Sequence, residues 1–297
     1  MRMDDEDQSR NVDDRRSSTG GRRGGGMPSM QTMMVLWPIV KPLLRSKFGL
    51  LIIGAGAAAY FMGYNPLSLI GMGGSASSVP VNKVQDEKRK VFISKVLKST
   101  EDVWTETLAQ YGLKYTKPTM VLYRGYTRSG CGSAQSQMGP FYCPTDKKVY
   151  LDLGFFDELA RRHNSPGDFA QAYVLAHEIG HHIQDLEGTL DKVQRAKQSW
   201  GGQAAKSNAL QVKVELQADC YAGAWAHHAQ KKFKMLEPGD IEEALNAASS
   251  IGDDTLQKKA GQRVRPDGFT HGSSAQRVSW FKRGFTSGDL RQCDTFQ

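Results

Sequence analysis

Residues 167–188 read GDFAQAYVLAHEIGHHIQDLEG, and the rest of the chain is best interpreted outward from this stretch. It contains the pattern H-E-x-x-H, formed by His177, Glu178 and His181. Side chains four residues apart lie on one face of a helix, so the two imidazoles can reach a single metal ion. Glu178 follows the first histidine directly, where its carboxylate can accept a proton from a metal-bound water without binding the metal itself.

This arrangement requires a helix, and the surrounding sequence predicts one. Ser165 is a favourable N-cap residue, Pro166 suits the first helical position, and Asp168 completes an S-x-x-D capping pattern. Gly188 is a natural end for the helix. The predicted apolar stripe consists of Phe169, Ala172, Ala176, Ile179 and Ile183. A solvated helix with two surface histidines remains the alternative for a motif this short.

A catalytic zinc ion takes three protein ligands and keeps one position open, so a third ligand is needed. Glu187 stands where the longer pattern H-E-x-x-H-x-x-G-x-x-H has its last ligand, but Gln184 replaces the glycine that turns the chain back to the metal. Glu215 and Asp219 are four residues apart on a later predicted helix. We expect Glu215 to bind the metal and Asp219 to orient the first histidine. An ordinary Glu–Asp pair on an exposed helix is the alternative.

The succession of H-E-x-x-H and E-x-x-x-D resembles the gluzincin metallopeptidases, of which thermolysin is the familiar member. Longer stretches resemble one bacterial family, the neutral zinc metallopeptidases. They read CGSAQSQMGPFYCP, VYLDLGFFDEL, GDFAQAYVLAHEIGHHIQ, ELQADCYAGAWAHHA, EPGDIEEALNAASSIGDD and FTHGSSAQRVSWFKRGF, with NVDDRR near the N-terminus. The resemblance covers nearly the whole chain. It implies a zinc metallopeptidase-like domain behind one membrane helix, and it implies no particular substrate.

A second, shorter resemblance concerns His271 and Arg277. The segment Thr270-His271-Gly272, with Arg277 six residues after the histidine, resembles the T-H-P…R segment of membrane-associated metallopeptidases related to the CAAX prenyl proteases. It implies that His271 is catalytic and that Arg277 is a candidate for stabilising the oxyanion. Gly272 stands where that pattern has proline, and a helix-capping or surface role for His271 is an equal alternative.

Elsewhere the pattern predicts a helix-rich α+β domain, with helices dominating its C-terminal half. Strands are expected at 119–123 and 148–153, and helices at 83–111, 166–187, 202–233, 238–260 and 273–287. Residues 130–144 are rich in Gly, Ser and Pro and predict a loop. We expect a peptide substrate to lie extended along an edge strand in the region from this loop to residue 153.

The four cysteines, Cys131, Cys143, Cys220 and Cys293, form no C-x-x-C pair, which argues against a thiolate zinc site. The most local pairing joins Cys131 to Cys143 and Cys220 to Cys293. Four buried free thiols are the alternative from composition alone. A domain that faces an oxidising compartment would favour the disulfides.

The N-terminal third has a different composition. Residues 1–47 are charged and glycine-rich and predict a disordered cytoplasmic tail, whereas residues 48–64 are almost purely apolar and residues 67–72 extend the apolar run past Asn65-Pro66. A cleaved signal peptide would have a shorter leading segment, and a buried core helix would carry a polar face. We therefore expect a transmembrane signal anchor at 48–70, a linker at 71–81 and the metallopeptidase-like domain at 82–297.

The expected location follows from Lys41, Arg45 and Lys47, which precede the apolar run. The positive-inside rule then places the N-terminus in the cytoplasm and the catalytic domain outside, on a single-pass protein of the inner (cytoplasmic) membrane. Such a chain would contact membrane lipid through one helix.

The formal charge of +8 is spread along the chain, with 9 Lys/Arg against 6 Asp/Glu in residues 1–47 and 30 against 25 in the remainder. We therefore expect no nucleic-acid partner. The predicted function is a zinc metalloendopeptidase with one Zn²⁺ per chain, a protein or peptide substrate and Glu178 as general base. A catalytically silent, membrane-tethered binding or assembly factor is the principal alternative. Binding of nucleic acid or anionic lipid by the basic tail is the weaker one.

Overall fold

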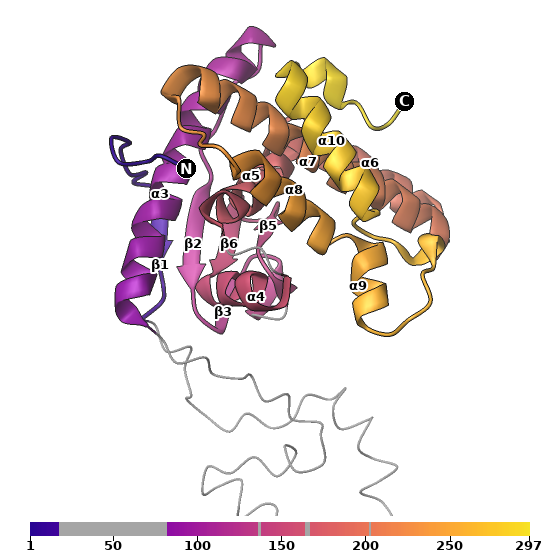
Figure 1. The fold of residues 1–297 in the computed structure, drawn as a ribbon. Coiled ribbons are helices and arrows are strands. Elements are labelled where there is room, and N and C mark those ends of the chain that lie inside the picture. The colour runs from indigo at the N-terminus through magenta and orange to yellow at the C-terminus, as the bar shows by residue number, and fades with distance from the viewer. Residues whose placement is uncertain (18–81, 136–137, 164–166, 202) are drawn as a thin grey trace, which may run out of the picture. The chain divides into compact units, whose positions relative to one another are not determined.

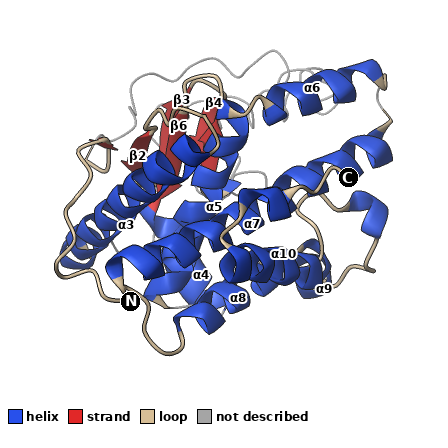
Figure 2. Ribbon diagram, turned by 90° about the horizontal axis from the view of Figure 1, so that it is seen from above, coloured by secondary structure: helices blue, strands red, loops and turns tan. Residues whose placement is uncertain are grey.

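The computed structural model describes residues 1–17, 82–135, 138–163, 167–201 and 203–297. Within them, helices pack against a small sheet, which agrees with the predicted helix-rich α+β class (Figures 1 and 2). The α-helices are α3 (Lys83–Gln110), α4 (Leu153–His163), α5 (Asp168–Leu186), α6 (Thr189–Ser199), α7 (Ala204–Phe233), α8 (Asp240–Ser250), α9 (Asp253–Lys259) and α10 (Ser274–Ser287). The strands are β1 (Val12–Asp14), β2 (Thr119–Tyr123), β3 (Tyr126–Ser129), β4 (Gly132–Gln135), β5 (Phe141–Cys143) and β6 (Lys148–Asp152).

The main sheet has the strand order β1-β2-β6-β5. β1, β2 and β6 run parallel, and β5 pairs antiparallel with β6. The predicted strands at 119–123 and 148–153 thus form its centre as β2 and β6, each with four of its five residues buried. One face of the two strands packs in the main core with the helices, and the other packs against β5 and Ala134 of β4. β3 and β4 form a separate hairpin, of which β4 lies inside the predicted 130–144 loop region and β3 directly before it.

Helix α5 is central to the core and is buried along most of its length. It packs closely against α7, and Gly180 permits this contact: a Cβ there would lie 2.9 Å from the carbonyl oxygen of Ala218. α7 in turn packs against α10, where Cβ atoms on Gly223 and Gly284 would meet the partner backbone at 2.1 and 1.9 Å. Small residues at these crossings therefore set how near the three helices lie.

Two helix boundaries differ from the prediction. α5 begins at Asp168 with Gly167 as its N-cap, and its first turn is capped from another helix, because the Phe169 N–H donates to Glu243 of α8 (3.0 Å). The predicted cap residues Ser165 and Pro166 lie outside the described residues. The helix expected over 238–260 is divided into α8 and α9. At the break, a Cβ on Gly252 would lie 2.5 Å from the backbone nitrogen of Ser274, so a close tertiary contact sets the boundary. Helices α4 and α6 were not predicted.

The first seventeen residues correct the prediction of a disordered tail over 1–47. They belong to the same compact unit as residues 81–297, and β1 forms the edge of the main sheet. Met3 is buried in the core. Composition suggested disorder because the segment has few apolar residues, but the exposed edge of β2 supplies backbone hydrogen-bond partners that no local pattern reveals.

The predicted anchor at 48–70 and linker at 71–81 lie outside the described residues. Among the helices that the structure describes, none is both long enough and apolar enough to cross a membrane.

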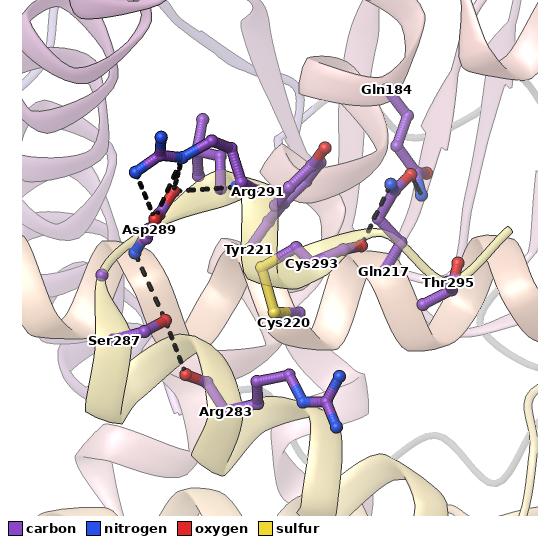
Figure 3. Close-up of a disulfide and its surroundings, with 12 residues drawn as sticks. Gln184, Gln217, Cys220, Tyr221, Arg283, Ser287, Asp289, Arg291, Cys293 and Thr295 are labelled. Atoms are coloured by element: carbon purple, nitrogen blue, oxygen red, sulfur yellow. Dashed lines mark hydrogen bonds and ion pairs between the residues drawn. A yellow bond between two sulfur atoms is a disulfide. The ribbon is translucent and has the colours of Figure 1, made fainter. Parts of the chain in front are cut away.

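Both disulfides are present in the favoured pairing, Cys131–Cys143 and Cys220–Cys293. The second joins α7 to the short 3-10 helix Leu290–Cys293 near the C-terminus, as Figure 3 shows. It links residues 73 positions apart, and closing a loop of that size in the unfolded chain corresponds to about 4 kcal/mol in the chain-entropy estimate.

Candidate active site

His177, His181 and Glu215 come together where α5 crosses α7. The Nε2 atom of His177 lies 3.2 Å from Oε2 of Glu215, and that of His181 lies 3.7 Å from the same oxygen. One potential ligand atom from each residue lies within 4.8 Å of the others. Helical spacing places the two histidines on one face, and the close crossing at Gly180 brings Glu215 to them. The structure thus brings together the three residues that the sequence predicted as metal ligands.

The imidazoles are oriented by hydrogen bonds at their other ring nitrogens. Nδ1 of His177 lies 2.9 Å from Oδ1 of Asp219, and Nδ1 of His181 lies 2.8 Å from Oε1 of Gln184. Since both acceptors require a protonated Nδ1, each neutral ring offers the lone pair of Nε2 to the site. Ligands 2.0–2.1 Å from a tetrahedral zinc ion lie roughly 3.4 Å apart. The observed separations of 3.2 and 3.7 Å bracket that value, so the donor set fits zinc.

Asp219 has the orienting position expected of it, and it is completely buried. Arg277 of α10 donates to both of its carboxylate oxygens (2.8 and 3.0 Å), and the Tyr173 hydroxyl donates to Oδ1 (2.5 Å). Burial opposes ionisation of Asp219, but the charges of Arg277 and His177 outweigh it and hold its pKa at about 2. Burial likewise opposes the charge on His177, and Asp219 outweighs it, raising the pKa to about 10 without metal. A metal ion would therefore displace a proton from this site.

Gln184 orients His181. In the sequence, this residue served only as an argument against Glu187 as the third ligand. Its Nε2 donates to the carbonyl oxygen of Val214 (2.8 Å) and to Oε1 of Gln217 (2.9 Å). Gln217 then donates to the carbonyl oxygen of Cys293 (3.2 Å), which the disulfide holds against α7 (Figure 3). The amide orientation of Gln184 is fixed by these bonds, so its oxygen faces His181.

Glu215 is fixed in the same way. Its Oε1 accepts a hydrogen bond from Gln211 (2.9 Å), one turn earlier on α7, and Lys197 of α6 donates to Gln211. This leaves Oε2 directed at the histidines. Glu187, the rejected alternative, is not part of the cluster; its carboxylate accepts a hydrogen bond from Tyr221 (2.8 Å).

A cleft of about 760 Å³ opens at these residues. Glu178 and all three candidate ligands line it, although Glu178 is only 7% exposed. Apolar side chains of several elements form much of the wall, among them Met138, Phe141, Phe155, Leu190 and Leu256. The site therefore has a largely apolar approach and a polar floor.

His271 also lines the cleft, on the loop before α10. It is not a helix cap, because Ser273 caps α10. Asp253 at the start of α9 holds this loop: its Oδ2 accepts the backbone N–H groups of Thr270, His271 and Gly272 at 2.7, 2.6 and 3.0 Å. Its Oδ1 lies 3.3 Å from Nδ1 of His271, and this contact raises the pKa of the imidazole. The His271 side chain is 49% exposed, as the surface alternative predicted.

Arg277 lies at the wall of the same cleft but is 2% exposed, and its guanidinium is engaged with Asp219. Its observed contacts are those of a residue that holds Asp219, while a role at an oxyanion stays a prediction. The sequence reasoning missed Tyr173, Gln211 and Asp253. Tyr173 stands one helical turn before His177, and Gln211 one turn before Glu215, so helical spacing could have indicated both; Asp253 is brought to His271 only by the fold.

A comparison with protein families matches nearly the whole chain to one family. The family described as "Putative neutral zinc metallopeptidase" matches residues 1–296. The chain belongs to this family. The match includes the first seventeen residues as well as the segment that contains the site.

Two relatives are similar to the chain over two thirds of its length or more. "Uncharacterized protein YpfJ" of Escherichia coli strain K12 is 47% identical over 300 residues, which cover 100% of this chain and 99% of the relative. "Uncharacterized protein Rv2575" of Mycobacterium tuberculosis strain H37Rv is 44% identical over 208 residues, 67% of each chain. No solved structure matches the chain. Family membership thus supports a zinc hydrolase at a coarse level.

Proposed function

We propose that the protein is a zinc-dependent metalloendopeptidase. The single observation that carries this proposal is the cluster of His177, His181 and Glu215, with Nε2 of both histidines directed at one carboxylate oxygen and Glu178 beside them in an open cleft. Two histidines, one carboxylate and an accessible face are the donor set of catalytic zinc, whereas structural zinc sites have four protein ligands.

When bound, zinc would lower the pKa of a coordinated water and polarise the scissile carbonyl group. Glu178 then acts as general base: its carboxylate accepts the proton released as water adds to the carbonyl carbon. It returns that proton to the nitrogen of the leaving amine as the C–N bond breaks. His271, held by Asp253, is placed at the cleft to donate a hydrogen bond to the carbonyl oxygen when its imidazole is protonated.

The proposed substrate is an extended polypeptide that binds beside β5. This strand ends the main sheet within the described residues, and Phe141 and Tyr142 line the cleft. An added strand would gain main-chain hydrogen bonds along the edge, and the apolar wall would accept alternate side chains. The expected edge in the 130–153 region is consistent with this placement.

We further propose that the domain works in an oxidising compartment, attached to a membrane through residues 48–70. The two disulfides support the compartment, since such bonds are rare in reducing cytosol. The apolar composition of 48–70 supports the attachment.

A catalytically silent binding factor that keeps the metal site would have no need of Glu178. One variant distinguishes such a factor from a metallopeptidase. Glu178→Gln keeps the size of the side chain but removes its basicity. We expect it to retain zinc and to lose hydrolysis of an unfolded protein substrate by about 100-fold or more. Full activity in this variant would refute the general-base assignment. A wild-type protein that binds zinc but cleaves no unfolded protein would favour the binding factor.

A further inference from the structure

The first seventeen residues are built into the catalytic domain. We call residues 1–17 the N-terminal arm. Its strand β1 pairs in parallel register with β2, from Val12 opposite Met120 to Asp14 opposite Leu122. Two backbone hydrogen bonds flank this strand pair, one at each end. The Met120 N–H donates to the carbonyl oxygen of Asn11, and the Arg15 N–H donates to the carbonyl oxygen of Leu122, each at 2.8 Å.

Side chains of the arm also complete a buried polar group of the domain. Glu101 of α3 is 1% exposed. Its Oε1 accepts hydrogen bonds from Ser9 (2.6 Å) and Asn11 (2.7 Å), both in the arm, and Lys117 pairs with its other oxygen (3.1 Å). A buried carboxylate is costly to leave without partners. The arm therefore satisfies a requirement of the domain core.

The arm runs along α3 as far as its first turns. Lys95 donates to the carbonyl oxygen of Met3 (2.6 Å), while Lys90 pairs with Asp14 (3.0 Å) and Arg16 pairs with Glu87 (2.6 Å). The last described residues of the arm thus lie at the same end of the domain as the beginning of α3. The chain leaves the domain and re-enters it at neighbouring points.

We infer that the N-terminal arm and the catalytic domain occupy the same side of the membrane. A chain that crosses a bilayer once has its two ends in different compartments. Such a crossing at residues 48–70 would separate β1 from β2 and remove both arm partners of Glu101. An exchange of arms between two molecules would not restore these contacts. In a single-pass protein, every arm lies on the opposite side of the membrane from every catalytic domain.

This inference replaces the single-pass topology expected from the basic residues before the apolar run, and it does not depend on the proposed catalytic activity. It also explains a sequence feature that a cytoplasmic tail would leave without a role: residues Val12–Asp14 form a strand with a defined register, flanked by backbone hydrogen bonds of Asn11 and Arg15.

Thiol labelling in cells tests the inference directly. All four cysteines are in disulfides, so the unaltered chain provides a background without free thiols. Asp5→Cys places one thiol on the arm and Arg263→Cys places one on the domain, both at exposed positions. Spheroplasts producing the full chain are treated with a membrane-impermeant maleimide, before and after permeabilisation.

We expect the two variants to behave alike, with both labelled before permeabilisation or both only after it. The first pattern also agrees with an extracytoplasmic domain, whereas the second would refute that location and leave the inference intact. Labelling of one variant on each side would overturn the inference. As a second measurement, amide exchange in the purified full chain should show Met120 and Arg15 protected; free exchange at both would overturn the docking on which the inference rests.

Discussion

Replacement of Gly180 by alanine is predicted to damage the metal site more than the stability of the fold. A Cβ at this position would lie 2.9, 3.0 and 3.2 Å from the oxygen, Cα and Cβ of Ala218. Ordinary contacts begin near 3.4 Å, so α5 and α7 must separate by about half an ångström. These helices carry the histidines and Glu215, respectively, and metal sites tolerate errors in ligand distance of only about 0.2 Å.

The expected loss of fold stability and the expected loss of zinc affinity differ in size. Overpacking a core costs about 1–3 kcal/mol, while alanine is favoured over glycine inside a helix by about 1 kcal/mol. The net loss of unfolding free energy for Gly180→Ala is therefore about 0–2 kcal/mol. Zinc affinity should fall by at least roughly tenfold, the lower bound typical of disturbed metal surroundings.

The assay is zinc competition against a chromophoric chelator, combined with urea unfolding of the metal-free protein. Gly268→Ala is the matched control, because its Cβ would meet nothing nearer than 3.9 Å. We expect this control to match the wild type in both measurements. Unchanged zinc affinity in Gly180→Ala would show that the helix crossing does not set the ligand geometry.

Two further substitutions test the groups behind the site. Asp219→Asn leaves Arg277 buried without its counter-charge. We therefore expect the unfolding free energy in urea titration to fall by about 3–5 kcal/mol and the zinc affinity to fall about 10–100-fold. Near-wild-type stability would contradict the ion pair between Asp219 and Arg277. Asp253→Asn removes the charge that raises the pKa of His271. If protonated His271 assists catalysis, activity is lost as pH rises through that pKa, so the alkaline limb of the pH–rate profile should move to lower pH; an unmoved limb would separate His271 from catalysis.

The sequence could indicate which side chains form the candidate metal site because helical periodicity is a local property. The spacing of His177 and His181, and of Glu215 and Asp219, fixes which side chains share a face before any tertiary contact is known. That α5 and α7 meet at Gly180 could not be read from spacing, because the contact depends on the path of the intervening α6, a helix that the sequence did not reveal.

The missed features share a physical cause, which is that their partners are distant in the chain. The first turn of α5 is capped by Glu243, and His271 is held by Asp253, and neither pair has a local signature. The N-terminal arm shows the same limit. Its composition predicts disorder, yet β2 and Glu101 offer it backbone and side-chain partners that only the folded domain provides.

The most direct test of the account is the zinc content of the purified full chain, compared among the wild type, His177→Ala, Glu215→Ala and Glu187→Ala. We predict a single zinc ion per wild-type chain, its loss or strong weakening in the first two variants, and its retention in Glu187→Ala, whose carboxylate lies outside the cluster. A well-folded wild type that takes up no zinc when supplied with it, or a Glu215→Ala variant that binds zinc as tightly as the wild type, would contradict the proposed metal centre.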